Sequence, residues 1–187
     1  MKLKKYTISK ELLKNLLDSN THIGTSKLNT KNNFYYYLYG FRKKTSIINL
    51  DYTVKNLKQL FTLLSFFLKT KKQIIFVGFP IWFNKKWKFL EYFSKKNYFF
   101  FNYTWKNKNN YFLKNCKKIG LVFVFNEYSR TKELVKEVKK FSIPLAGFTS
   151  SNLHFFDYPI VGNFQSKKSI YVFFYFLFNI LTIKEKT

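Results

Sequence analysis

Apolar residues recur at helical spacing in several parts of the chain. Over 11–18 the leucines lie on one side and predict an amphipathic helix, with Ser9 as a candidate N-cap. The same spacing predicts three more helices, over 52–69, 83–94 and 129–140. Either Asn49 or Asp51 could cap the helix at 52–69.

Short apolar runs alternate with these helices. Gln73–Val77 and Ile119–Phe125 are continuous, as in strands buried on both faces of a parallel sheet. Shorter strands are expected over 45–51, 98–102 and 145–148. Strands that alternate with such helices predict an α/β fold, three-layered and doubly wound (flavodoxin-like or Rossmann-like), with helices on both faces of a central parallel sheet. Such sheets bind ligands at the carboxyl ends of their strands.

The chain shows no internal repeat and no linker rich in Pro, Gly or Ser, so one domain over 1–187 is expected. Its parts would be an N-terminal helix and loop (1–44), a sheet core (45–165) and a C-terminal helix (166–187). The uncharged apolar run from Ser169 to Ile183 has 15 residues, fewer than the roughly 20 of a spanning helix. We therefore expect no membrane insertion, and the N-terminus lacks the pattern of a secretory signal.

The charge balance is strongly basic, with 34 Lys and Arg against 9 Asp and Glu and a net charge of +25. Only Arg42 and Arg130 are Arg, and residues with AT-rich codons (Phe, Tyr, Lys, Asn and Ile) make up more than half of the chain. This composition indicates an AT-biased genome, so part of the Lys excess is codon drift. Codon bias does not explain the shortage of acidic residues, and a polyanionic partner is the first hypothesis.

Signatures of catalysis and of ligand binding are missing. The turn at 78–83 (GFPIWF) lacks G-x-G-x-x-G and places bulky side chains where a pyrophosphate needs bare backbone. Cys116, His22 and His154 do not have the spacing of metal ligands. Asp157 could pair with His154, but no nucleophile signature accompanies them. We expect no enzyme activity, no cofactor, no metal and no small-molecule substrate.

Basic residues outside the predicted helices stand in loops with Asn, Ser and aromatic residues. Lys neutralises phosphates, Asn and Ser reach sugar and phosphate oxygens, and Tyr or Trp can stack on unpaired bases. Such loops suit RNA. The candidate RNA-binding residues are Lys27, Lys31, Arg42, Lys43, Lys44, Trp105, Lys106 and Lys108, with Lys167 and Lys168 where the last helix begins.

Short motifs follow one another in a recognisable order. The most specific is Asp157–Asn163 (DYPIVGN), which is similar to D-Y-P-I-P-G-N. Others are His22-Ile23-Gly24 (within G-x-H-x-G-H), Tyr39–Arg42 (G-x-R), Ile47–Leu50 with Thr53 (I-I-D-L and a Thr), Phe76-Val77-Gly78 (F-V-G), Trp105, Ile143-Pro144 (I-P), Ser151-Asn152 (T-N) and Ser169-Ile170 (S-I). Along nearly its whole length the chain resembles the family of small-subunit ribosomal protein two.

The resemblance implies a three-layer α/β domain that binds small-subunit rRNA between head and body, contacts neighbouring ribosomal proteins and has no catalytic role. Bacterial members carry a helical hairpin after the Trp motif; only 106–118 follows Trp105 here before the next strand, so that insertion is expected to be absent. Asn107 and Lys108 also replace the glycines of that motif. The missing hairpin and the AT-biased composition favour an organellar ribosome. We expect it in the mitochondrial matrix rather than in a plastid. The lack of a presequence fits an organelle-encoded product.

The residues that carry the family motifs are His22, Gly24, Gly40, Gly78, Pro144, Asn152, Asp157, Pro159, Gly162 and Asn163. Plain structural interpretations stay open for them. His22 could satisfy loop hydrogen bonds, and Gly24, Gly40, Gly78 and Gly162 would form turns. Trp105 could pack, and 157–163 could end an edge strand. Two rival functions also remain, a peripheral membrane protein that lays its lysines and aromatic C-terminal helix on anionic lipid, and an α/β enzyme.

Overall fold

The computed structural model describes residues 10–78, 98–101, 115, 117–125, 131–150 and 153–183. Five strands pair in parallel in the order β5-β4-β6-β7-β8. Counted along the chain this is 2-1-3-4-5, the strand order of flavodoxin-like sheets. The strands are β4 (Gln73–Val77), β5 (Tyr98–Phe101), β6 (Ile119–Val124), β7 (Leu145–Thr149) and β8 (Tyr158–Val161).

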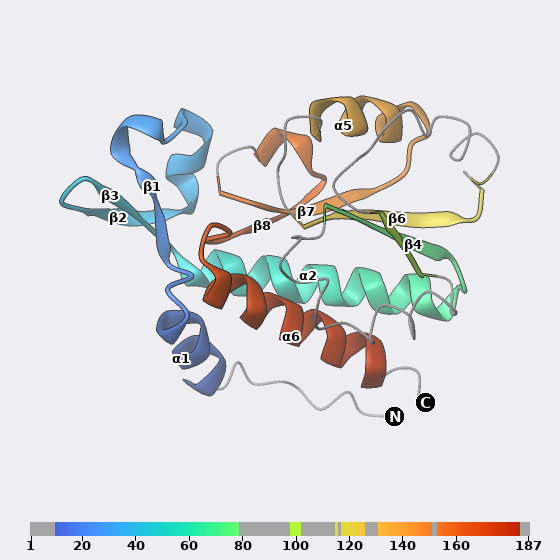
Figure 1. Ribbon diagram of the computed structural model, residues 1–187, viewed down its shortest axis with the longest axis horizontal. Helices are drawn as coiled ribbons and strands as arrows, with labels where there is room; N and C mark the ends of the chain where they lie inside the picture. Colours follow the sequence, from blue (N-terminus) through green and yellow to red (C-terminus); the bar gives the residue numbers. More distant parts are fainter. Residues whose placement is uncertain are drawn as a thin grey trace.

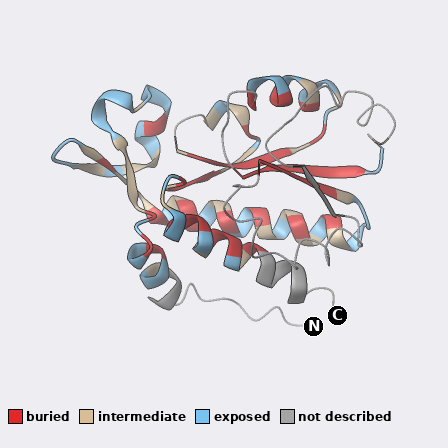
Figure 2. Ribbon diagram, viewed as in Figure 1, coloured by how far each residue is buried: buried red, intermediate tan, exposed pale blue. Residues whose placement is uncertain are grey.

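Helices cover both faces of this sheet (Figure 1). The helices α2 (Leu50–Lys69) and α6 (Lys167–Ile183) lie on one face and α5 (Thr131–Lys140) on the other. Alternate residues of β4 divide between the two layers: Ile74 and Phe76 belong to the core cluster with α2 and α6, Ile75 and Val77 to the cluster with α5. Figure 2 shows the buried sheet between helices with exposed outer surfaces. The predicted three-layer α/β fold is confirmed.

A second, smaller sheet lies at one end of the molecule (Figure 1). It is antiparallel, in the order β1-β3-β2, and two short 3-10 helices join its first two strands. We call residues 23–48 the antiparallel unit; its elements are β1 (Ile23–Ser26), η1 (Lys27–Asn29), η2 (Asn32–Tyr37), β2 (Leu38–Arg42) and β3 (Thr45–Ile48).

The strand expected over 45–51 forms as β3, but it pairs with β1 and β2, so the parallel sheet begins only at β4. Its burial alternates between half-buried and buried positions, whereas β6 and β7 of the parallel sheet are buried throughout. A run as short as TSII does not distinguish these cases. The loop expected after the first helix, within 1–44, likewise contains β1, η1, η2 and β2.

The predicted helices form where the structure describes them. The first, α1, spans Lys10–Asp18. The second begins at Leu50 because the Asn49 side chain accepts a hydrogen bond from the Asp51 N–H (3.0 Å), which identifies Asn49 as the cap. Ser9, the helix expected over 83–94 and residues 106–114, where a hairpin insertion would stand, lie outside the described residues. None of the described helices is long and apolar enough to cross a membrane.

Candidate nucleic-acid interface

The motif Asp157–Asn163 closes one edge of the parallel sheet. Asp157 forms a reciprocal pair with Leu145: its carboxylate accepts from the Leu145 N–H (2.9 Å), and its own N–H donates to the Leu145 carbonyl (2.8 Å). On β8, the edge strand, the Pro159 carbonyl accepts from the Asn56 side chain of α2 at 2.8 Å. These contacts support the architectural interpretation of the motif.

Asn163 joins the N-terminal loop to the last helix. Its N–H donates to the Thr21 carbonyl (3.0 Å) and its Nδ2 donates to the Asn20 carbonyl (3.1 Å). Its Oδ1 accepts from the N–H groups of Gln165 (3.1 Å) and Ser166 (3.3 Å), just before α6. One side chain therefore orders the start of α6 and ties it to the loop that leads into the antiparallel unit.

The other motif residues are also placed by backbone contacts. His22 accepts a hydrogen bond from the Ile48 N–H at its carbonyl (2.7 Å), while its buried Nδ1 has no partner among the described residues. The Pro144 carbonyl, just before β7, accepts from the Val122 N–H at 3.1 Å. Asn152 lies outside the described residues.

The interpretation of the motif glycines as turn residues holds for Gly78, which follows β4 with φ of 80°. It is wrong for Gly24 and Gly40, which lie within β1 and β2 and do not have positive φ. Gly24 is needed for close approach, because a Cβ there would lie 2.3 Å from Ser46 Oγ. At Gly162 a Cβ would contact the ring of Phe164 at 3.1 Å.

Five of the ten candidate RNA-binding residues come together in the antiparallel unit, and all are exposed: Lys27, Lys31, Arg42, Lys43 and Lys44. The Lys27 N–H donates to the Lys44 carbonyl (2.8 Å), which places η1 against the tip of the β2–β3 hairpin. Lys27 Nζ lies 5.5 Å from the centre of the Phe41 ring. Residues 19–50 contain these five basic residues and no Asp or Glu. The unit therefore has a positive potential with no acidic side chain of its own.

The hairpin tip places a lysine in an unusual backbone conformation. Arg42 pairs with Thr45, so Lys43 and Lys44 form a two-residue loop. Lys43 has φ of 56°, in the left-handed region that favours Gly or Asn. For another residue this conformation costs about 1 kcal/mol. Of the two adjacent cations at this tip, Lys43 thus occupies a position whose backbone geometry alone would favour Gly or Asn.

Exposed tyrosines flank these cations, and they were missed in the sequence, where only Trp105 is named for stacking. Tyr35, Tyr36 and Tyr39 are all exposed, Tyr39 at 83%. The Tyr36 ring lies 4.9 Å from that of Tyr52 at the start of α2. A hydrogen bond with Tyr36, together with burial, raises the pKa of Tyr52 above its ordinary value. The signal was the run YYYLY at 35–39, within a stretch rich in Lys and Asn.

The remaining candidates are not brought to this unit. Trp105, Lys106 and Lys108 lie outside the described residues. Lys167 and Lys168 are exposed on the first turn of α6, and Lys168 lines a groove between α1 and α6.

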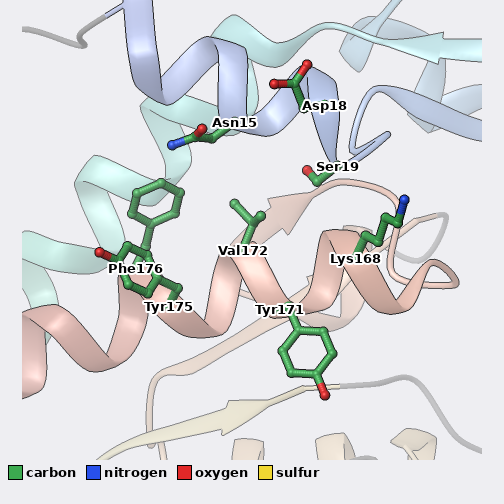
Figure 3. Close-up of a pocket in the computed structure, with 8 residues that line it drawn as sticks. All are labelled: Asn15, Asp18, Ser19, Lys168, Tyr171, Val172, Tyr175 and Phe176. Atoms are coloured by element: carbon green, nitrogen blue, oxygen red, sulfur yellow. The ribbon is translucent and has the colours of Figure 1, made fainter.

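That groove has a volume of about 540 Å³. It is lined by Asn15, Asp18, Ser19, Lys168, Tyr171, Val172, Tyr175 and Phe176 (Figure 3). In this view Asp18 points away from α6 and the Tyr171 ring away from α1. A small-molecule site has polar groups that converge on one ligand, and these do not. Among the described residues no three His, Cys, Asp or Glu side chains could together hold a metal ion.

These features define a three-layer α/β protein that carries a basic, tyrosine-rich antiparallel unit. The sequence model of the family described as ribosomal protein S2 matches residues 16–105. The match contains the whole antiparallel unit, α2, β4 and β5, and it covers just under half of the chain. It supports assignment to that family, whose members are structural components of the small ribosomal subunit. A search of curated proteins found no match to the chain.

Proposed function

We propose that the protein is a structural constituent of a small ribosomal subunit and binds its rRNA through the antiparallel unit. The observation that carries the proposal is the set of five exposed basic residues in a stretch without acidic residues, inside the region that the family model matches. Cations placed against RNA phosphates release condensed counterions, which is the main source of affinity in such contacts.

The place of a lysine in the structure indicates whether its charge serves RNA binding or reflects codon drift. On α5, which has four lysines, Glu133 and Glu137 alternate with Lys132 and Lys136 and reduce the net charge of the helix to +2. Pairs of this kind contribute about 0.5 kcal/mol or less to stability. The antiparallel unit has no acidic residue to offset its positive charge. A polyanion bound there would therefore gain the most electrostatic free energy.

We further propose that this ribosome is mitochondrial and that the protein is encoded by the organelle's own genome. A plastid ribosome is the second candidate. The AT-rich codon composition supports the organellar assignment, as does the short segment between Trp105 and β6. Within the subunit the protein would contact neighbouring ribosomal proteins as well as rRNA, without cofactor, metal or catalysis. Co-fractionation with mitochondrial small subunits tests the location.

The rival function as a peripheral membrane protein needs the aromatic face of the C-terminal helix to be free for lipid. Phe173, Phe174 and Leu177 of α6 are instead buried in the core, and of its large hydrophobic side chains with described burial only Tyr171 and Tyr175 are exposed. Membrane-surface helices bury that face in the lipid headgroups. The packing of α6 therefore favours the ribosomal proposal.

Two variants with the same change in net charge test the proposal. In the first, Lys27, Lys31, Arg42, Lys43 and Lys44 are replaced by Gln; in the control, five exposed helix lysines are replaced, namely Lys55, Lys58, Lys69, Lys132 and Lys139. Binding to small-subunit rRNA fragments is measured against salt concentration. We expect the first variant to lose roughly three to five units of the log–log salt slope and the control far less. Equal losses would show that only total charge matters, and absence of the protein from small subunits would overturn the proposal.

A further inference from the structure

The register between β2 and β3 is irregular at one position. Leu38 pairs with Ile48 and Gly40 with Ile47, so β2 advances two residues while β3 advances one. Tyr39 is the additional residue of this β-bulge. Bulges leave one residue out of the ladder and redirect its side chain, and they are frequent next to functional sites.

The surroundings of Tyr39 are open. Its side chain is 83% exposed, more than that of any other tyrosine described. It belongs to an edge strand, and a Cβ at the neighbouring Gly40 would meet nothing within 4 Å. A planar ligand would therefore find room beside the ring.

Other rings of the unit are already engaged by protein groups. The Phe41 ring lies 5.7 Å from that of Tyr35, with Lys27 Nζ over it. Tyr36 packs edge-on against Tyr37, with ring centres 5.4 Å apart. Tyr39 has no ring partner among the described residues, although Arg42 follows it on the same strand and Lys43 and Lys44 follow in the loop. An exposed ring with nearby cations and no acidic neighbours suits a nucleobase attached to a phosphate backbone.

We infer that Tyr39 is a stacking platform for an unpaired base, so that the antiparallel unit selects single-stranded segments of RNA over duplex. The inference rests on the proposed function and deepens it. In a duplex each base face is covered by its neighbours, and only a splayed base can lie on the ring. The cations at 42–44 supply affinity for the backbone, whereas Tyr39 supplies the preference for unpaired bases.

The test compares a 12-nucleotide single-stranded RNA that carries 2-aminopurine with a duplex of the same length. We expect the parent protein to quench the 2-aminopurine fluorescence. Tyr39→Ala should weaken single-strand binding roughly 5- to 100-fold, with the salt slope and duplex binding unchanged. Tyr39→Phe keeps the ring and should stay within about twofold of the parent. Tyr175→Ala, at a tyrosine 64% exposed on α6, is the matched control and should change nothing.

The outcomes separate the two proposals. If Tyr39→Ala binds single strands as tightly as the parent while the five-site charge variant loses its salt slope, the stacking inference is wrong and RNA binding stands. If the parent binds no RNA, the proposed function itself fails. Urea unfolding of Tyr39→Ala confirms that the variant is folded, and a loss of affinity that appears equally with duplex would also overturn the inference.

Discussion

The hydroxyl of Thr53, near the start of α2, donates a hydrogen bond to the carbonyl of Val161 at the end of β8, at 2.8 Å. The residues are 108 positions apart and both are buried. β8 is one of the two edge strands of the parallel sheet, so its outward carbonyls have no neighbouring strand. Thr53 supplies the missing donor for Val161, as Asn56 does for Pro159, and the helix thereby closes the edge.

Replacing Thr53 by Val should destabilise the protein by about 1–3 kcal/mol, because the Val161 carbonyl would stay buried without a partner. Val has nearly the same shape as Thr, so little packing is lost. The urea concentration at the midpoint of unfolding should fall. The m-value, which is the slope of the unfolding free energy against urea concentration, should stay the same.

Thr62→Val is the matched control in the same helix. The Thr62 hydroxyl donates only to the Lys58 carbonyl within α2, and the residue is exposed. We expect a change within about 0.5 kcal/mol. Equal effects of the two variants would assign the loss to helix propensity rather than to closure of the edge.

The central strands of the parallel sheet could be predicted because they are buried between the two helix layers. β4 and β6 are continuous apolar runs, and the pattern that marks them needs no knowledge of their partners. The helices α2 and α5, which precede β4 and follow β6, were equally visible, since one apolar face repeats at helical spacing. The motif at 157–163 was located, but its role depends on Thr53 and Asn56, which the local sequence does not connect to it.

The antiparallel unit could not be predicted in the same way. β1 is a four-residue polar strand, IGTS, and its pairing with β3 depends on close contact between Gly24 and Ser46. The basic loops were recognised, yet their proximity depends on the bond between Lys27 and Lys44, which lie 17 positions apart. Tyr39 differs from the neighbouring tyrosines only because the register between β2 and β3 leaves it out of the ladder. Register is a property of two strands, so the local sequence around Tyr39 does not reveal it.

Gly24→Ala should destabilise the protein by about 1–3 kcal/mol through overpacking. Ser46 Oγ, 2.3 Å from the new methyl position, donates to the Thr25 carbonyl (2.7 Å), so moving it breaks a hydrogen bond. Gly40→Ala is the control, because nothing lies within 4 Å of its Cβ position; we expect a neutral or slightly stabilising effect. Thermal unfolding of both variants measures the difference, and similar losses at the two glycines would contradict the contact with Ser46.

Asn163→Ala should cost about 1–2 kcal/mol, because it removes the acceptor for two N–H groups before α6 and the donor to Asn20. Asn163→Asp keeps the acceptor, and its charge near the N-terminus of the helix is favourable. We expect the aspartate variant to lose less than half as much stability in urea unfolding. If both variants lose the same amount, the bond to Asn20 matters more than the order at the start of α6.

Lys43→Asn should separate stability from RNA binding, since Lys43 carries charge in a strained conformation. Asn tolerates positive φ, so the variant should gain about 0.5 kcal/mol of unfolding free energy. It should also lose about one unit of the salt slope for rRNA binding, because one phosphate contact disappears. Lys44→Asn, at the next position without positive φ, should lose the same slope with no gain in stability. A gain in stability together with a loss of RNA binding at Lys43, but not at Lys44, would show that Lys43 is kept for its charge. A loss of stability in Lys43→Asn would show instead that Lys43 makes a contact that outweighs its strain.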